Sequence, residues 1–365
     1  MRSSIGNKIK VTIFGESHGP GVGFVVDGIR SGLLIDEELI QKYLNFRRPY
    51  GKISTPRVEK DNYQILSGCF NGRTTGMPLT IFVENTNTKS KDYSKIRFYP
   101  RANHGDYTYH IKYNGFNDYR GGGHSSGRLT TALVILGSIL RSDLAKKGIY
   151  IGSHIKQIYN IKDHSFNQDN LDEEVKLVNS KLFSVLSDEV EVKMKKAIES
   201  AANDNDSLGG IIETAITNLP VGIGDPMFHS LESQISHYIF SVGAIKGIEF
   251  GLGFDFVNHR GSEVMDEFVV ENSKVKTLQN NNAGINAGIS NGMPVIFRSV
   301  VKPTPSIFKE QKSIDMNNLE NVLYTINGRH DPCIVHRVRV VIDSVVAICI
   351  YDILLATYGD NYFDE

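Results

Sequence analysis

Apolar runs bounded by glycine and asparagine recur along the chain, and their length and alternation predict β-strands. Each run is short, and turn-forming residues stand at both of its ends. The predicted strands are Lys8–Phe14, Val22–Val26, Gln64–Leu66, Leu79–Val83, Ile211–Ile216, Ile245–Phe250 and Val295–Val301.

Helical periodicity is of two kinds. Asp36–Phe46, Asp188–Ala202 and Met227–Phe240 carry apolar residues on one face, which is typical of helices on a protein surface. Ser126–Leu144 and Val335–Thr357 are apolar almost all round, so we expect them at the centre of a sandwich of sheets and helices. The pattern as a whole predicts an α+β fold.

A short internal echo suggests a pseudo-duplication. Gly76–Phe82 resembles Gly292–Phe297, and each copy precedes an irregular segment and then an apolar helix. A match of this length also arises by chance, so two similar strand starts remain the alternative. We expect one domain over residues 1–365.

Composition narrows the class of protein. Forty basic residues against 41 acidic ones give a net charge of −1, which argues against a general polyanion binder. The chain is 40% hydrophobic, as globular proteins are, and its 34 glycines cluster, which suggests close backbone approach to a ligand. No uncharged apolar run is long enough for a membrane span, no signal peptide is recognisable, and the three cysteines lack metal or redox spacing. We therefore expect a cytoplasmic protein with free thiols.

The stretch Asn85–Gly123 shows no clear secondary structure. It holds seven basic residues against three acidic ones, with eight aromatic residues between them. So long an irregular segment usually binds or covers something. A small anionic metabolite or a single-stranded nucleic acid stacked on the rings would suit it.

The segment Gly15–Gly19 follows a predicted strand and has the Gly-x-Ser-x-Gly spacing of a hydrolase elbow. It leads into another strand rather than a helix, so we reject that interpretation. His18, between glycines, is placed for proton transfer to a ligand, although a turn histidine bonded to backbone is the alternative.

Three further segments favour anion binding. Arg47 and Arg48 end a helix, where they could bind an anion or simply be solvated. The triglycine at 121–123 leads into Ser125 and Ser126, which suit a phosphate, with a plain helix N-cap as the alternative. Near the C-terminus, Asp331 follows Arg and His, which suits either a proton acceptor or a structural ion pair.

The glycine-rich segment 281–292 is followed by Lys302-Pro303-Thr304-Pro305-Ser306, whose two prolines fix the path of a charged, hydroxyl-bearing cradle. His104, Asp106, His110 and His124 could be taken for metal ligands. Their spacing matches no strong ligand pattern, so we expect no metal.

Taken in order along residues 10–355, these segments resemble the chorismate synthase family. The resemblance depends on seven motifs in register rather than on any one of them. They are Gly15–Gly19, Arg47–Pro49, Ser90–Tyr93 with His104–Tyr109, Asp118–Arg128, Gly288–Gly292, Lys302–Ser306 and Arg329–Cys333.

The resemblance implies a β-α-β sandwich and an anti 1,4-elimination that converts 5-enolpyruvylshikimate 3-phosphate into chorismate. Family members require reduced FMN without net redox change. The implied roles are His18 as the acid near the leaving phosphate, His104 as the group that protonates or neutralises the reduced flavin, and Asp331 in moving a proton through flavin N5. Arg48 and Lys52, and more weakly Arg128, would bind the substrate. The residues implied at the flavin site are His124, Ser125, Ser126, Gly243, Ala244, Ala287, Lys302, Pro303, Thr304, Pro305, Ser306 and Arg329.

The chain departs from the family pattern in four places. His124 stands where the family usually has Arg, and Gly127 and Leu129 flank Arg128 where Ala and Glu are common. Lys52 replaces a second arginine, and Ala287 replaces a glycine in a segment one residue short. His336-Arg337 replaces a commoner Pro-Arg. These changes put flavin-phosphate affinity in doubt but leave His18, His104 and Asp331 in place.

The resemblance also implies a homotetramer. Some relatives reduce FMN with NADPH, but no dinucleotide fingerprint occurs here, so we expect an external flavin reductase. Two alternatives stay open, namely a flavin-binding protein without elimination activity and a single-stranded nucleic-acid-binding protein.

Overall fold

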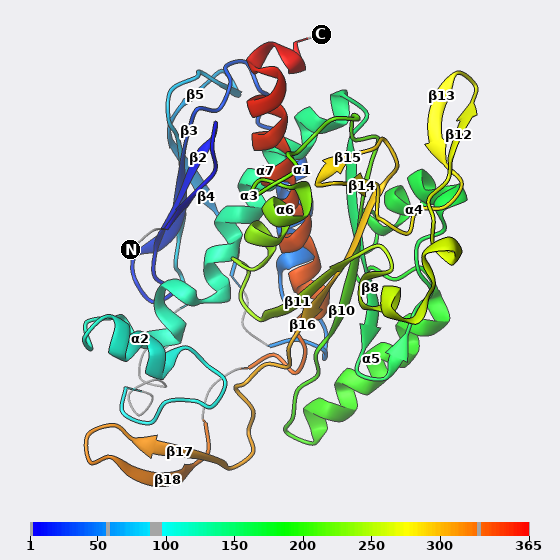
Figure 1. Cartoon of the computed structure of the whole chain (residues 1–365). Coiled ribbons are helices and arrows are strands. Elements are labelled where there is room, and N and C mark those ends of the chain that lie inside the picture. Colours follow the sequence, from blue (N-terminus) through cyan, green and yellow to red (C-terminus); the bar gives the residue numbers. More distant parts are fainter. Residues whose placement is uncertain (1–2, 56–58, 88–96, 327–329, 365) are drawn as a thin grey trace.

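Two antiparallel five-stranded sheets enclose a layer of helices (Figure 1). The computed structural model describes residues 3–55, 59–87, 97–326 and 330–364. Helices α3 (Thr130–Lys146) and α7 (Val335–Tyr358) pack on each other, α3 also contacts the first sheet, and α7 also contacts the second. The arrangement is the β-α-β sandwich that the resemblance implied, with the two long buried helices that the apolar pattern predicted.

The first sheet has the strand order β1-β2-β3-β7-β4. The turn between β2 and β3 is the Gly15–Gly19 segment, so this segment joins two paired strands and is no hydrolase elbow. The bounds are Ser4–Ile5 for β1, Lys10–Gly15 for β2, Gly21–Asp27 for β3, Leu79–Glu84 for β7 and Tyr63–Ser67 for β4.

The second sheet has the order β11-β16-β10-β8-β9. Within the described residues, four hairpins lie outside the two large sheets, and their strands are two to five residues long. The sheet strands are Ile245–Phe250 (β11), Val295–Val301 (β16), Gly210–Thr217 (β10), Tyr150–Ile158 (β8) and Ile161–Lys162 (β9). The hairpins are Cys69–Phe70 with Arg73–Thr74 (β5, β6), Phe268–Glu271 with Lys274–Thr277 (β12, β13), Ile285–Asn286 with Ile289–Ser290 (β14, β15), and Gln311–Asp315 with Glu320–Tyr324 (β17, β18).

The remaining helices cover the sandwich and its edges. Helices α1 and α6 contact α7, whereas α4 and α5 contact strands of the second sheet. Their bounds are Glu37–Arg47 (α1), Asp106–Lys112 (α2), Leu171–Val178 (α4), Asp188–Asn203 (α5) and Leu231–Ile239 (α6).

All seven predicted strands are present, and Ile245–Phe250 and Val295–Val301 have the predicted bounds. Three sequence predictions need correction. The helix predicted from Met227 begins at Leu231, because Ser230 caps it by accepting a hydrogen bond from the backbone N–H of Ser233 at 3.1 Å. The helix predicted from Ser126 starts as a 3₁₀ turn at Gly127–Leu129 before α3, and Asn85–Gly123 contains α2.

Strand β8 was missed because polar residues interrupt its apolar pattern. Ser153 and His154 are fully buried, and each pairs with a side chain of the adjacent β10. The Ser153 hydroxyl lies 2.8 Å from that of Thr214, and His154 Nε2 lies 2.9 Å from Glu213 Oε2. These polar side chains can be buried because strand β10 supplies their hydrogen-bond partners. The local sequence of β8 does not reveal those partners.

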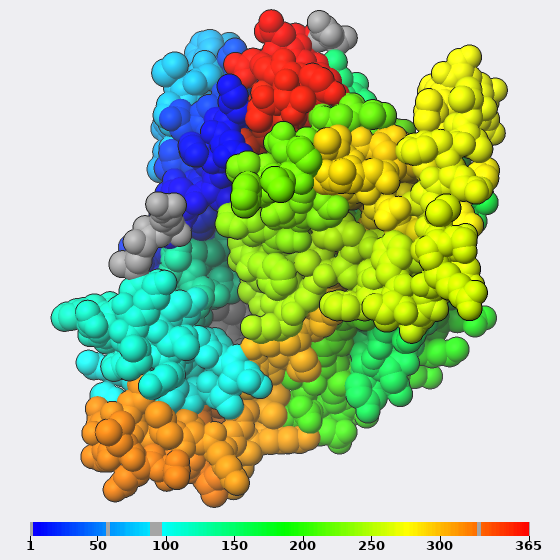
Figure 2. Space-filling model, in the orientation of Figure 1, coloured from blue at the N-terminus to red at the C-terminus, as the bar shows by residue number. Residues whose placement is uncertain are grey.

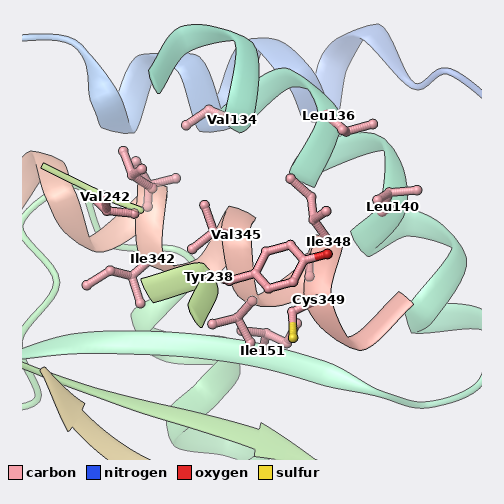
Figure 3. Packing of buried hydrophobic residues seen from close by; sticks show 14 of the residues in the cluster. Val134, Leu136, Leu140, Ile151, Tyr238, Val242, Ile342, Val345, Ile348 and Cys349 are labelled. Carbon is pink, nitrogen blue, oxygen red and sulfur yellow. The ribbon is translucent and has the colours of Figure 1, made fainter. Parts of the chain in front are cut away.

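The core is continuous between the layers. Figure 3 shows Val134, Leu136 and Leu140 of α3 on one side of α7 and Ile151 of β8 on the other, with Ile342, Val345 and Ile348 of α7 and Tyr238 of α6 in the same buried cluster. Helix α7 is long and apolar enough to cross a membrane, but 89% of its most hydrophobic window is buried in the protein. Burial identifies it as a core helix.

The two echoing segments run into β7 in one sheet and β16 in the other, and each of these strands lies next to an edge strand. This placement is compatible with a duplicated unit. The duplication itself stays a prediction.

Gly137 allows the close packing of α3 on α7. A β-carbon at this position would lie 2.4 Å from Ser344 Cβ and 2.5 Å from Ser344 Cα, which belongs to the backbone of α7. We expect Gly137→Ala to destabilise the protein by about 1–3 kcal/mol through overpacking. Replacing an exposed helical glycine by alanine normally increases the free energy of unfolding by roughly 0.5–1 kcal/mol. A decrease for Gly137→Ala would therefore indicate overpacking. Urea unfolding measures it, with Gly261→Ala, where a β-carbon meets no atom within 4 Å, as the control.

Candidate active site

The triglycine turn brings His18 and His104 to one place. A β-carbon at Gly121 would lie 2.6 Å from Cδ2 and Nε2 of His18, and one at Gly122 would lie 3.8 Å from Cε1 of His104. Both glycines have positive φ, at 59° and 86°. Ser17 holds the turn by donating its hydroxyl to the carbonyl oxygens of Arg120 and Gly121 at 3.2 and 3.1 Å. The missing side chain at Gly121 therefore lets His18 approach the backbone closely, whereas His104 is only in ordinary contact distance of position 122.

His104 is held by a buried ion pair. Its Nδ1 lies 2.7 Å from Asp106 Oδ1, and Arg101 donates to both carboxylate oxygens of Asp106 at 2.8 and 2.9 Å. Burial would raise the pKa of Asp106, but the hydrogen bonds from Arg101 and His104 outweigh it and hold the pKa well below its ordinary value. Arg101 also donates to the hydroxyl of Ser306 at 3.0 Å. The pair thus connects His104 to the 302–306 cradle.

The cradle lies at the end of β16 and beside the segment that carries His104. Lys302 donates from Nζ to the carbonyl of Asn103 and from its backbone N–H to that of Ala244 at 2.9 Å. In Figure 2 the cyan segment that includes 101–106 lies against the orange segment that includes 302–324. A groove of about 330 Å³ between them is lined by Ala102, Asn103, Asp206, Ser207, Lys302, Pro303, Thr304, Pro305, Ile307 and Gln311.

The cradle is positively charged. Burial, followed by the charge of Lys246 on β11, lowers the pKa of Lys302 below its ordinary value. Within the described ranges no carboxylate forms an ion pair with either lysine. Gly243 and Ala244 immediately precede this strand, so two predicted flavin residues adjoin the lysine pair. Two neighbouring cations without an acidic partner favour an anionic ligand.

Asp331 lies on the other side of the cradle. Its carboxylate accepts from the backbone N–H of Thr55 at 2.9 Å and from Arg337 at 2.6 Å, and its carbonyl accepts from the Thr304 hydroxyl at 2.7 Å. The adjacent His336 is fully buried, and burial lowers its pKa to about 3. Neutral His336 pairs with the hydroxyl of Ser54 at 2.8 Å, next to Thr55. Arg337 therefore binds Asp331 directly, whereas His336, the position that departs from the family, is connected to it through Ser54 and the neighbouring Thr55.

A cluster of arginines shares one buried carboxylate. Asp61, 2% exposed, binds Arg47 at 3.3 Å, Arg48 at 3.2 Å and Arg128 at shorter range. Burial would raise the pKa of Asp61, but the charges of Arg47 and Arg128 outweigh it and lower that pKa. Arg128 also pairs with Glu59 at 2.7 Å, so its charge is neutralised within the protein. Arg48 is the most exposed of the three arginines.

The cluster is connected to both neighbouring regions. Asn85 accepts from Arg128 at 2.9 Å and donates to the carbonyls of Glu16 and Gly19 at 2.9 Å, which fixes the loop that carries His18. Arg337, which binds Asp331, also donates to the carbonyl of Arg47 at 2.8 Å.

The residues after the triglycine serve mainly local structure. His124 Nδ1 donates to the carbonyl of Gly15 at 2.8 Å, and its Nε2 lies 3.1 Å from the Ser3 hydroxyl. Ser126 caps the 3₁₀ turn before α3, while exposed Ser125 donates to Gly122. His124 is thus held away from the His104–Asp106 pair, and among the described residues no three His, Cys, Asp or Glu side chains form a metal-binding group.

Among the described residues, Ala287 lies away from the cradle. Ala287 lies in the β14–β15 turn, at the opposite end of seven-residue β16 from Lys302, and strand geometry makes that separation roughly 20 Å. Within one chain the structure does not bring Ala287 to the cradle. Lys52 is exposed in the loop that leads to Thr55. Arg329 and the motif residues Ser90–Tyr93 lie outside the described residues.

Sequence reasoning missed several residues that organise the site. Arg101 and Asp106 flank His104 closely, so their spacing could have suggested a charge pair around it. Lys246, two residues after Ala244, was equally visible as a basic residue in a predicted strand. Asp61, Glu59 and Asn85 carried no local signal, because their partners are distant in the chain.

Asp61 should control stability against acid. The pKa of Asp61 is lower in the folded protein than in the unfolded chain, where it is about 3.9. The ionised carboxylate therefore stabilises the fold at pH values above about 3.9, and this stabilisation is lost as pH falls toward the folded-state pKa. We expect Asp61→Asn to lower the free energy of unfolding at pH 7 by about 3–5 kcal/mol, because buried arginines lose their counter-charge. The penalty should shrink below pH 4. Denaturant unfolding at both pH values tests this, with exposed Asp204→Asn as the control; an equal penalty at both would contradict it.

Comparison with known proteins agrees with this geometry. The chorismate synthase family model matches residues 9–355. Chorismate synthase of Methanobrevibacter smithii is 44% identical over 353 residues, covering 96% of each chain, and that of Lachnoclostridium phytofermentans is 43% identical over 360 residues, covering 97% of this chain and 95% of its own. A crystal structure of chorismate synthase superposes with a TM-score of 0.77 at 28% identity, covering 99% of this chain and 96% of that one. The chain belongs to the chorismate synthase family.

Proposed function

We propose that this chain is a chorismate synthase, a carbon–oxygen lyase that removes phosphate from 5-enolpyruvylshikimate 3-phosphate and a hydrogen from C6 of its ring. The observation that supports the proposal is that His18 and His104 lie near the same triglycine turn of a chain that belongs to this family. His104, through Asp106 and Arg101, and Asp331, through Thr304, are both connected to the 302–306 cradle. Family membership gives no support to a nucleic-acid-binding module or to a flavoprotein without elimination activity.

The cradle residues fit reduced FMN. Lys302 and Lys246, which pair with no carboxylate in the described part of the chain, suit its phosphate. The largely apolar groove that Thr304 lines suits a planar ring with a few polar atoms. When bound, reduced FMN supplies negative charge transiently to the substrate ring and recovers it, so the elimination needs no net redox change. Walls that exclude water would also strengthen every charge interaction at the site.

Each of the three proposed catalytic residues has a distinct role. His18, packed on Gly121 and 8% exposed, donates a proton to the departing phosphate. His104 presents its Nε2 side toward the triglycine turn and neutralises negative charge on the flavin. Asp331, held by Thr55 and Arg337, accepts the proton that originates from C6.

Arg48 is the best-placed substrate-binding arginine. Arg128 is 6% exposed and is already paired with Glu59 and Asp61, so its role is to orient the cluster. Arg48 is more exposed, and exposed Lys52 follows in the same segment. Both can reach carboxylates of an anionic substrate entering from solvent.

The assembly and its supply of cofactor follow the same proposal. The whole chain forms one catalytic domain. The protein is cytoplasmic and assembles as a homotetramer. It takes FMN that a separate reductase has already reduced and does not itself reduce FMN with NADPH. Large apolar side chains such as Phe228, Phe254 and Val257 are 81–90% exposed in the single chain, and subunit interfaces commonly cover such residues. An interface could also bring Ala287 of one subunit toward another.

Anaerobic turnover with chemically reduced FMN tests the reaction. Phosphate release and chorismate formation in equal amounts are expected, with none when oxidised FMN replaces reduced FMN. No release under reducing conditions would defeat the proposal.

His104→Ala should still bind flavin but lose most turnover, by roughly 10²–10⁴-fold for removal of a proton-transfer group. Fluorescence titration measures flavin binding, and anaerobic phosphate release measures turnover. His259→Ala, which removes an exposed histidine paired with Asp255, is the matched control. Near-normal turnover of His104→Ala would remove the role assigned to His104.

A further inference from the structure

We propose that Asp106, held by Arg101, is a positioning residue that fixes the tautomer of His104, so that the neutral imidazole carries its proton on Nδ1 and turns Nε2 toward the ligand. The inference rests on the proposed function only in identifying that ligand as the flavin. The tautomer itself is a property of the protein without ligand.

Proton accounting supports this assignment. Nδ1 of His104 lies 2.7 Å from Asp106 Oδ1, a distance that requires one hydrogen between them. Asp106 is ionised, because the side chain of Arg101 donates to both carboxylate oxygens of Asp106. The backbone N–H of Arg101 also donates to Oδ2 at 3.0 Å. The hydrogen therefore belongs to Nδ1. Arg101 Nη2 also lies 3.1 Å from His104 Nδ1, but a guanidinium has no acceptor for the hydrogen on Nδ1. Arg101 Nη2 therefore donates to Asp106 Oδ1 at 2.9 Å instead.

The remaining nitrogen faces the triglycine turn. A β-carbon at Gly122 would lie 3.9 Å from Nε2 of His104, so the glycine leaves space on this side of the ring. Neutral histidine in water favours the proton on Nε2, which would turn a donor toward the ligand at all times. With the proton on Nδ1, Nε2 can be protonated and deprotonated in turn. A general acid that acts in every catalytic cycle must be reprotonated in this way.

The pair is built to keep this geometry. Arg101 and Asp106 are 6% and 8% exposed, and the free end of Arg101 donates to Ser306 in the cradle. The β17–β18 hairpin is held beside this segment, because Ser313 donates to the carbonyl of Pro100 at 2.5 Å. The same pair therefore connects the orientation of His104 to the position of the cradle.

Nitrogen-15 NMR of histidine-labelled protein without flavin tests the tautomer directly. We expect neutral His104 in the wild-type chain to show the Nδ1–H form. In Asp106→Asn the amide has only one acceptor oxygen, while Arg101 presents donors to both positions. The amide nitrogen should then face His104, and the Nε2–H form should predominate. His104→Ala identifies the resonance.

Kinetics give a second readout. Asp106→Asn should lower kcat by about 10- to 100-fold, as loss of a carboxylate behind a functional histidine commonly does, and leave KM for the substrate little changed. Asp255→Asn is the matched control, because Asp255 pairs with exposed His259 at 3.3 Å in a region that the site does not use.

The outcomes separate the two proposals. An Nε2–H tautomer in the wild-type chain overturns the positioning role, and that measurement needs no variant to fold. Unchanged tautomer and kcat in Asp106→Asn overturn it as well, and leave the proposed function standing. Absence of elimination by the wild-type chain defeats the proposed function, whereas the NMR result still decides the role of Asp106.

Discussion

Excess positive charge at a ligand site must be tolerated by the folded protein before the ligand arrives, and this constraint shapes the structure. Arg47, Arg48 and Arg128 come from two segments and converge on Asp61. A single buried carboxylate holds them near one another against their mutual repulsion. Because Arg128 begins the segment that leads into α3, the cluster also fixes the arginines to the central helix layer.

The same principle recurs at the histidine. Arg101 needs a counter-charge, Asp106 supplies it, and His104 uses the carboxylate oxygen that faces it. The cradle differs from both, because Lys302 and Lys246 lie close without a carboxylate within the described part of the chain. Charge is thus compensated where orientation matters and left uncompensated where a phosphate is proposed to bind. The triglycine turn completes the site, because Gly121 lets the backbone approach the imidazole of His18 closely while Gly122 lies near that of His104.

The sandwich supplies rigidity to loops that carry the chemistry. His18 lies in the turn of a paired hairpin, Lys302 follows the end of β16, and Asp331 lies just before α7. Side chains at the ends of paired strands and of a buried helix lose little further entropy when a ligand binds, which favours preorganisation. The close contact of α3 with α7 at Gly137 keeps these anchors together across the central layer.

The sequence by itself determined the elements with clear local periodicity and the motifs that give the family. Strands β11 and β16 and helix α7 were predictable because each has its own apolar pattern and terminators. Only the tertiary structure decided which polar groups are partners. Strand β8 escaped prediction because His154 meets Glu213 on another strand, and the Asp61 and Asp106 clusters unite side chains whose charges are compensated through space. Hydrophobic periodicity is local along the chain, whereas electrostatic and hydrogen-bond satisfaction depends on neighbours that folding alone brings together.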